Sequence, residues 1–202
     1  MTPHHKKALL LSYFGLSYNL IEGVLSVFLG AVSNSISLIG FGLDSFVESL
    51  SGMVMIWRFG SQKSLTHKEE EKIEEKATKL VGYTFFALAV YVLYESVSKL
   101  YFGRPSDPSF FGIIITLFSL MVMPFLYFEK KKISVTINSR SLAADAKQTL
   151  ACMFLSISVL TGLALNYFFG FWQADPIVGI LVSVMLLREG VLAIREARLC
   201  GC

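Results

Sequence analysis

Six long apolar stretches follow one another along the chain, separated by short polar segments. Each is close to the ~20 residues that a helix needs to cross the hydrocarbon core of a bilayer. They cover residues 8–32, 36–57, 77–102, 109–128, 141–168 and 174–194. The pattern predicts an all-α membrane protein with six transmembrane helices, forming one membrane domain over residues 1–202 with no soluble domain.

The segments between the stretches predict how the helices are joined. Residues 33–35 are too few for anything but a tight polar turn, so the first two spans are expected to form an antiparallel hairpin. The segment before the third span mixes acidic and basic residues at i,i+4 spacings, which predicts a helical cytosolic extension of that span. Its alternative role is a metal-collecting acidic loop that includes His67.

Composition and charge agree with a membrane protein. Hydrophobic residues make up 54% of the chain and charged residues 16%. The basic residues gather in the 58–76 and 129–140 loops, whereas Lys99 and Arg104 lie at the other side, so the positive-inside rule puts both termini in the cytosol. These loops explain the net charge of +3 without a nucleic-acid partner. We expect a multi-pass protein of a bacterial inner or plasma membrane, with the lipid bilayer around it.

Asp44 and Glu48 lie one helical turn apart in the second stretch. A charged side chain at the bilayer centre costs roughly 2.5 to 3.5 kcal/mol on insertion scales, so two on one helix face indicate a function. They can be neutralised by protons, by a basic partner or by a metal cation. The alternative is that both acids are protonated or satisfied by neighbouring helices.

A second polar stripe lies on the fifth stretch, where polar residues fall at i, i+3, i+4 and i+7. Its members are Asp145, Gln148, Thr149 and Cys152. If the second and fifth spans pack together, counting from the span ends places Asp44 and Cys152 near the midplane and Asp145 near the cytosolic entrance. The predicted metal-ligating set is Asp44, Glu48, Gln148 and Cys152, with Asp145 at the entrance.

Four donors including a thiolate suit zinc or another soft cation. Each donor also has a simpler interpretation, since a cysteine in a membrane helix is often a packing residue and a glutamine often forms an interhelical hydrogen bond. Glu22, on the first span, is either a third member of the polar interior or a protonated hydrogen-bond partner. Asp175 is expected to cap the helix that begins at residue 174, although it could also meet a departing cation.

Three segments resemble the cation diffusion facilitator family. They are residues 37–48 (SLIGFGLDSFVE), 144–150 (ADAKQTL) and 174–179 (ADPIVG), in the right order and spacing. The resemblance covers essentially the whole chain. It implies an antiporter of a divalent metal, usually zinc, and protons, working as a homodimer with a metal site between the second and fifth spans.

This chain departs from the family pattern in two respects. Better-known members have two aspartates on the second span and a His-x-x-x-Asp pair on the fifth; here Glu48 replaces one aspartate, and Gln148 and Cys152 occupy the latter two positions. Only Asp44 carries over unchanged, so Asp145 is a candidate substitute ligand. We also expect the chain to lack the cytosolic domain that normally follows the sixth span in the family, which predicts a short branch that dimerises through its membrane helices. Cys200 and Cys202 form a possible metal-collecting tail.

We therefore predict a transporter that moves a divalent cation, zinc first, by proton antiport. The cation is cargo, and no resident cofactor is predicted. The alternative is a non-transporting membrane protein that binds metal or partner helices and modulates other transporters. A membrane metalloenzyme is disfavoured, because no histidine-rich ligand set and no paired nucleophile and base are found.

Overall fold

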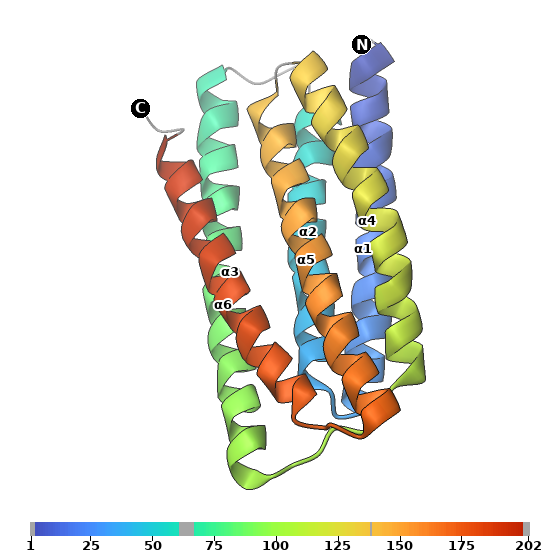
Figure 1. Cartoon of the computed structure of the whole chain (residues 1–202). Coiled ribbons are helices and arrows are strands. Elements are labelled where there is room, and N and C mark those ends of the chain that lie inside the picture. Colours follow the sequence, from blue (N-terminus) through green and yellow to red (C-terminus); the bar gives the residue numbers. More distant parts are fainter. Residues whose placement is uncertain (1–2, 61–66, 138, 200–202) are drawn as a thin grey trace.

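The computed structural model describes residues 3–60, 67–137 and 139–199. Six helices run up and down as one bundle (Figure 1). They are α1 (Pro3–Val32), α2 (Ile36–Gly60), α3 (His67–Phe102), α4 (Phe110–Thr136), α5 (Arg140–Phe169) and α6 (Ala174–Leu199). The predicted all-α architecture is confirmed. Helix α3 begins ten residues before the predicted third span, which confirms its helical extension.

Five helices are long and apolar enough to cross a membrane, within the described part of the chain. They are α1 to α5. The sixth, α6, carries Arg188, Glu189 and Arg195 in its second half. The start of α1 and the end of α6 lie at the same end of the bundle, called here the upper end (Figure 1). That this end faces the cytosol stays a prediction.

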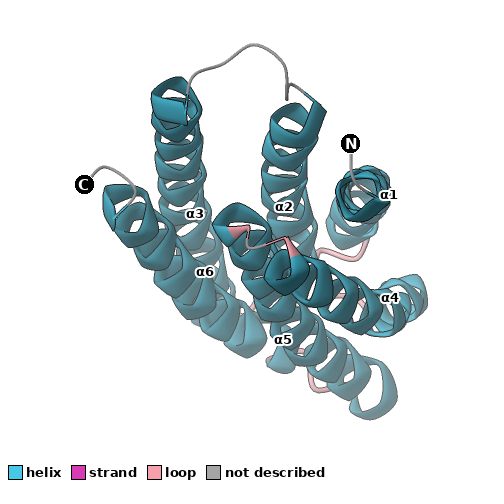
Figure 2. Ribbon diagram, turned by 90° about the horizontal axis from the view of Figure 1, so that it is seen from above, coloured by secondary structure: helices cyan, strands magenta, loops and turns pink. Residues whose placement is uncertain are grey.

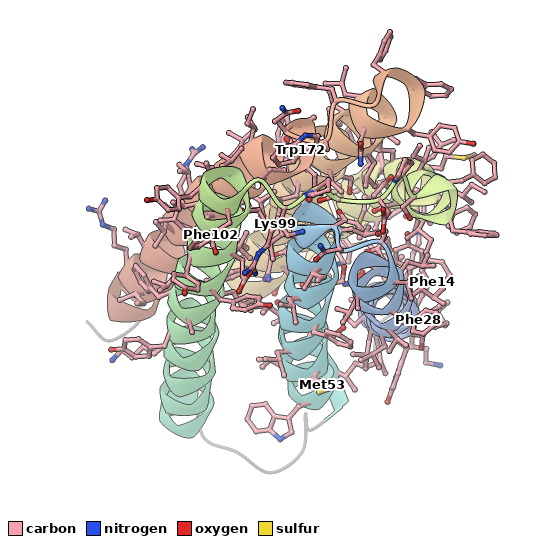
Figure 3. All side chains as sticks on the ribbon, turned by 90° about the horizontal axis from the view of Figure 1, so that it is seen from below. Phe14, Phe28, Met53, Lys99, Phe102 and Trp172 are labelled. Atoms are coloured by element: carbon pink, nitrogen blue, oxygen red, sulfur yellow. The ribbon has the colours of Figure 1, made fainter. Side chains whose placement is uncertain are left out.

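Helices α2 and α5 form the centre of the bundle (Figure 2). Helix α2 packs against α1, α3, α5 and α6, and α5 packs against α2, α4 and α6. The outer faces are apolar; Phe14 and Phe28, for example, point outward from α1 (Figure 3). Exposing so many apolar side chains to water would be unfavourable, so these outer faces are expected to contact lipid.

The predicted hairpin of α1 and α2 is confirmed, and glycines explain how closely the two helices pack. A Cβ atom on Gly42 would lie 2.8 Å from the Val27 nitrogen and 2.9 Å from the Gly23 oxygen, and one on Gly30 would lie 2.9 Å from the Ile39 nitrogen. Larger residues would therefore force the two backbones apart. The turn between the helices passes through Asn34, whose φ of 50° is in the left-handed region that asparagine tolerates.

Candidate metal site

Asp44 and Glu48 project from α2 into the interior, and both side chains are buried, with residue exposures of 5% and 1%. Helix α5 faces them, as predicted. The Cys152 side chain lies close to the Asp44 carboxyl group. One turn nearer the upper end, the Thr149 hydroxyl donates to Glu48 Oε1 at 2.6 Å. The two polar stripes therefore face each other, with Thr149 in hydrogen-bond contact with Glu48.

Asp145 lies another turn toward the upper end. Its Oδ1 accepts a hydrogen bond from the Ser51 hydroxyl at 3.0 Å, which again joins α5 to α2. Asp145 is 2% exposed, so it lies inside the bundle and not at an open entrance.

Lys130 is the residue that the sequence analysis missed. The pattern of basic residues predicts a loop over residues 129–140, and this is wrong for residues 129–136, which are helical. Helix α4 continues to Thr136 because residues 129–132 (EKKK) are good helix formers, and Ile133 continues its buried face. Lys130 is 2% exposed, and its ammonium lies inside the site.

The Lys130 ammonium contacts both central helices. Nζ lies 2.9 Å from Asp145 Oδ2 and 3.6 Å from Glu48 Oε1, and it donates to Thr149 Oγ1 at 2.9 Å. A buried ammonium needs such partners, because taking a charge out of water is expensive. The group formed by Lys130, Glu48, Asp145, Thr149 and Ser51 is called the Lys130 cluster below.

If all the buried acids and bases were ionised, the interior would carry more negative than positive charge. Among the described residues away from the lower end, the only buried base is Lys130, whereas the buried acids are Glu22, Asp44, Glu48 and Asp145. Glu22 accepts hydrogen bonds from the Tyr18 hydroxyl at 2.7 Å and the Ser45 hydroxyl at 2.9 Å. It therefore belongs to the polar interior, between α1 and α2. This excess of carboxylates favours an additional cation or protons.

Three polar atoms in the site have no hydrogen-bond partner among the described residues: Glu48 Oε2, Gln148 Nε2 and Asp145 Oδ2. Of these, Asp145 Oδ2 forms the ion pair with the Lys130 ammonium at 2.9 Å. Within the same part of the chain, no three His, Cys, Asp or Glu side chains come together in a group that could hold a metal. The predicted ligands therefore lie on two adjacent helices, α2 and α5, but are not gathered around one point. They are Asp44, Glu48, Asp145, Gln148 and Cys152. This ligand set stays a prediction. Cys200 and Cys202, and the side chain of His67, lie outside what is described.

Asp175 has a different role from the predicted one. It lies in the first turn of α6, but its carboxylate accepts from backbone nitrogens at the start of α2: those of Ile36 at 3.0 Å and Ser37 at 3.4 Å. The expectation that it caps its own helix is corrected, because the 33–35 turn brings the start of α2 against that of α6.

Hydroxyl groups complete the partners of Asp175. Ser35 and Ser37 donate to Oδ1 at 2.5 Å each, and Ser106 donates to Oδ2 at 2.7 Å. Lys99 donates to the Asn34 backbone carbonyl and to Ser106, between α3 and α2 (Figure 3). This group, the Asp175 cluster, joins α2, α6 and the connection between α3 and α4 at the lower end.

The comparison with known proteins identifies the family. Residues 12–199 match the model of the cation efflux transmembrane domain. The chain is 24% identical over 192 residues to the cadmium, cobalt and zinc/H(+)-K(+) antiporter of Bacillus subtilis (strain 168), covering 92% of this chain and 60% of that protein.

Two further relatives come from other lineages. Transmembrane protein 163 of Xenopus laevis is 21% identical over 189 residues, covering 93% of this chain and 66% of that protein. Magnetosome protein MamB of Magnetospira sp. (strain QH-2) is 25% identical over 170 residues, covering 81% of this chain and 57% of that protein. The chain thus spans about 60% of the length of the curated relatives it matches.

The predicted resemblance to cation diffusion facilitators is confirmed. The apolar helices make the chain a multi-pass integral membrane protein, and its bacterial relatives support the plasma membrane. Since the family model covers nearly the whole chain, the chain belongs to the cation efflux transmembrane domain family.

Proposed function

We propose that this protein moves a divalent metal cation across the membrane, and that its ligands come from Asp44, Glu48, Asp145, Gln148 and Cys152. The observation that carries this proposal is the pair of buried carboxylates on α2 that faces the polar stripe of α5. Cadmium, cobalt and zinc occur in the name of the Bacillus relative, and the thiol of Cys152 favours such cations over magnesium or calcium.

Zinc in exchange for protons is the specific form of the proposal. Carboxylate and thiol ligands must be deprotonated to bind a metal, so protons and metal compete for the same atoms. Metal binding on one side and reprotonation on the other then couple the two flows. The upper end faces the cytosol in this proposal, and the protein works as a homodimer formed by its membrane helices.

Zinc uptake into proteoliposomes with an imposed pH gradient tests this function. The wild type is compared with Asp44→Asn, which keeps the size of the side chain and removes its charge. Asp107→Asn is the matched control, because Asp107 is exposed on the connection between α3 and α4. We expect gradient-driven uptake by the wild type and the control, and loss of at least about 90% of it in Asp44→Asn.

Two observations favour a second candidate function. No three His, Cys, Asp or Glu donors converge in the described part of the chain, and the Lys130 ammonium already neutralises part of the site. Such a protein could bind partner helices or metal without turnover and modulate other transporters. Absence of uptake for zinc, cadmium and cobalt, in well-folded protein, would favour this candidate over transport.

A further inference from the structure

The position of Lys130 raises the question of why a positively charged side chain lies among the proposed metal ligands. Its side chain is 3% exposed, and its nearest acidic partner, Asp145 Oδ2, is 2.9 Å away. Most lysines near the end of a membrane helix extend their ammonium to the interface. This one instead points inward, between α2 and α5.

The carboxylates that hold the ammonium are two of those proposed to bind the metal. Glu48 Oε1 is shared by Thr149 and Lys130, while Glu48 Oε2 is buried without a hydrogen-bond partner among the described residues. A zinc ion bound to Glu48 and Asp145 would lie about 2 Å from their oxygens. It would then be almost in contact with an ammonium on the same oxygens, and two cations at that distance repel strongly in a low-dielectric interior.

Lys130 has a short way out of the cluster. It lies six residues before the end of α4 at Thr136, which is about 9 Å along the helix axis. On its α1 side the neighbour is Gly15, where even an added Cβ would lie 3.8 Å from Nζ. With no side chain there to hold it, the long flexible stem can turn toward the upper end and bring the ammonium to the interface.

We propose that Lys130 is a built-in competitor of the transported cation: its ammonium occupies the Glu48 and Asp145 carboxylates in the metal-free protein and leaves them when a divalent cation binds. The inference rests on the proposed function, since it concerns the same ligands. Each divalent cation that enters expels one positive charge, so the charge of the cluster changes by one unit. When the metal leaves, the ammonium returns and the carboxylates are not left uncompensated.

The first test is zinc binding to the purified full-length protein in detergent, measured by calorimetry. Lys130→Met removes the competing charge and keeps most of the apolar stem, and Lys131→Met is the matched control, because Lys131 is exposed and donates to Tyr127. We expect Lys130→Met to bind zinc about tenfold more tightly than the wild type, and Lys131→Met to bind as the wild type does.

Thermal unfolding separates competition from a merely structural role. If Lys130 competes with the metal, Lys130→Met lowers the Tm of the metal-free protein but increases the rise in Tm that zinc produces. If Lys130 only connects helices, the variant lowers the Tm equally with and without zinc, and its zinc affinity is unchanged or weaker. That result would overturn the inference.

A measurement on the wild type covers the case in which the variant fails to fold. A membrane-permeant amine-reactive reagent, followed by mass spectrometry, reports the accessibility of Lys130, with Lys131 as internal reference. Zinc should increase Lys130 labelling several-fold and leave Lys131 labelling unchanged. Unchanged or reduced Lys130 labelling in zinc-bound protein would contradict displacement. No binding of zinc, cadmium or cobalt by the wild type would instead refute the proposed function, and this inference with it.

Discussion

The Asp175 and Lys130 clusters solve the same problem, a carboxylate buried among membrane helices, in two different ways. Asp175 is surrounded by neutral donors, with three hydroxyls and two backbone N–H groups directed at its two oxygens. Glu48 and Asp145 share a lysine ammonium, and Glu48 Oε2 has no hydrogen-bond partner among the described residues. A fully satisfied carboxylate stabilises one structure, whereas a partly satisfied one can exchange partners.

The largest expected effect is the loss of Asp175. In Asp175→Ala the start of α2 and three buried hydroxyls lose their acceptor, which should lower the free energy of unfolding by roughly 3 kcal/mol or more. Denaturant unfolding in detergent measures this loss. Zinc affinity should remain within about twofold of the wild type in the folded fraction. Asp107→Ala is the control. If both substitutions lowered the free energy of unfolding by the same small amount, the Asp175 cluster would not have the structural role described here.

Asp145→Asn should have the next largest effect. It leaves the Lys130 ammonium without its closest carboxylate, and breaking a buried ion pair costs about 3 kcal/mol. The double variant Lys130→Met with Asp145→Asn removes both charges, so it should lose less stability than the two single variants together. A double-mutant cycle measures the difference, which we expect to exceed about 1 kcal/mol. Additive effects would mean that the two charges do not interact.

Glu48→Gln should have the smallest effect on stability, below about 1 kcal/mol. The glutamine oxygen can still accept from Thr149, and Lys130 keeps Asp145 as its closer acidic partner, at 2.9 Å against 3.6 Å for Glu48. The substitution also removes a charged oxygen that lacks a hydrogen-bond partner. Zinc affinity should nevertheless fall by at least about tenfold, because a proposed ligand is lost. Calorimetry together with unfolding separates the two quantities. A large loss of stability at unchanged zinc affinity would mean that Glu48, like Asp175, stabilises the fold and does not bind the metal.

Much of the arrangement could be predicted from hydrophobic periodicity. Six apolar stretches correspond to six helices, and the i, i+3, i+4 and i+7 spacing of polar residues on α5 placed Cys152 opposite Asp44. Both results depend on helix geometry, which local sequence encodes. The match to the family model then confirmed the family that the segments at residues 37–48, 144–150 and 174–179 had indicated.

Lys130 and Asp175 could not be assigned in the same way, because their roles depend on tertiary contacts. A buried lysine and a solvated one look alike in a run such as EKKK. A signal was nevertheless present: the buried residues of α4 recur at alternating spacings of four and three, and this pattern continues through Lys130 to Ile133. Asp175 binds Ser35, which lies 140 residues earlier in the chain just before α2, and local sequence does not specify such a pairing.

This long separation also affects how the protein is made. The Asp175 carboxylate is synthesised with the last helix, but most of its donors belong to the start of α2, and another, Ser106, precedes α4. Because synthesis proceeds from the N-terminus, five helices enter the membrane before this acceptor exists. Until α6 inserts, the hydroxyls of Ser35 and Ser37 lack their acceptor in the finished fold. Placement of the last helix is therefore the step that completes the lower end, and a chain that stops before residue 175 leaves these buried hydroxyls without that acceptor.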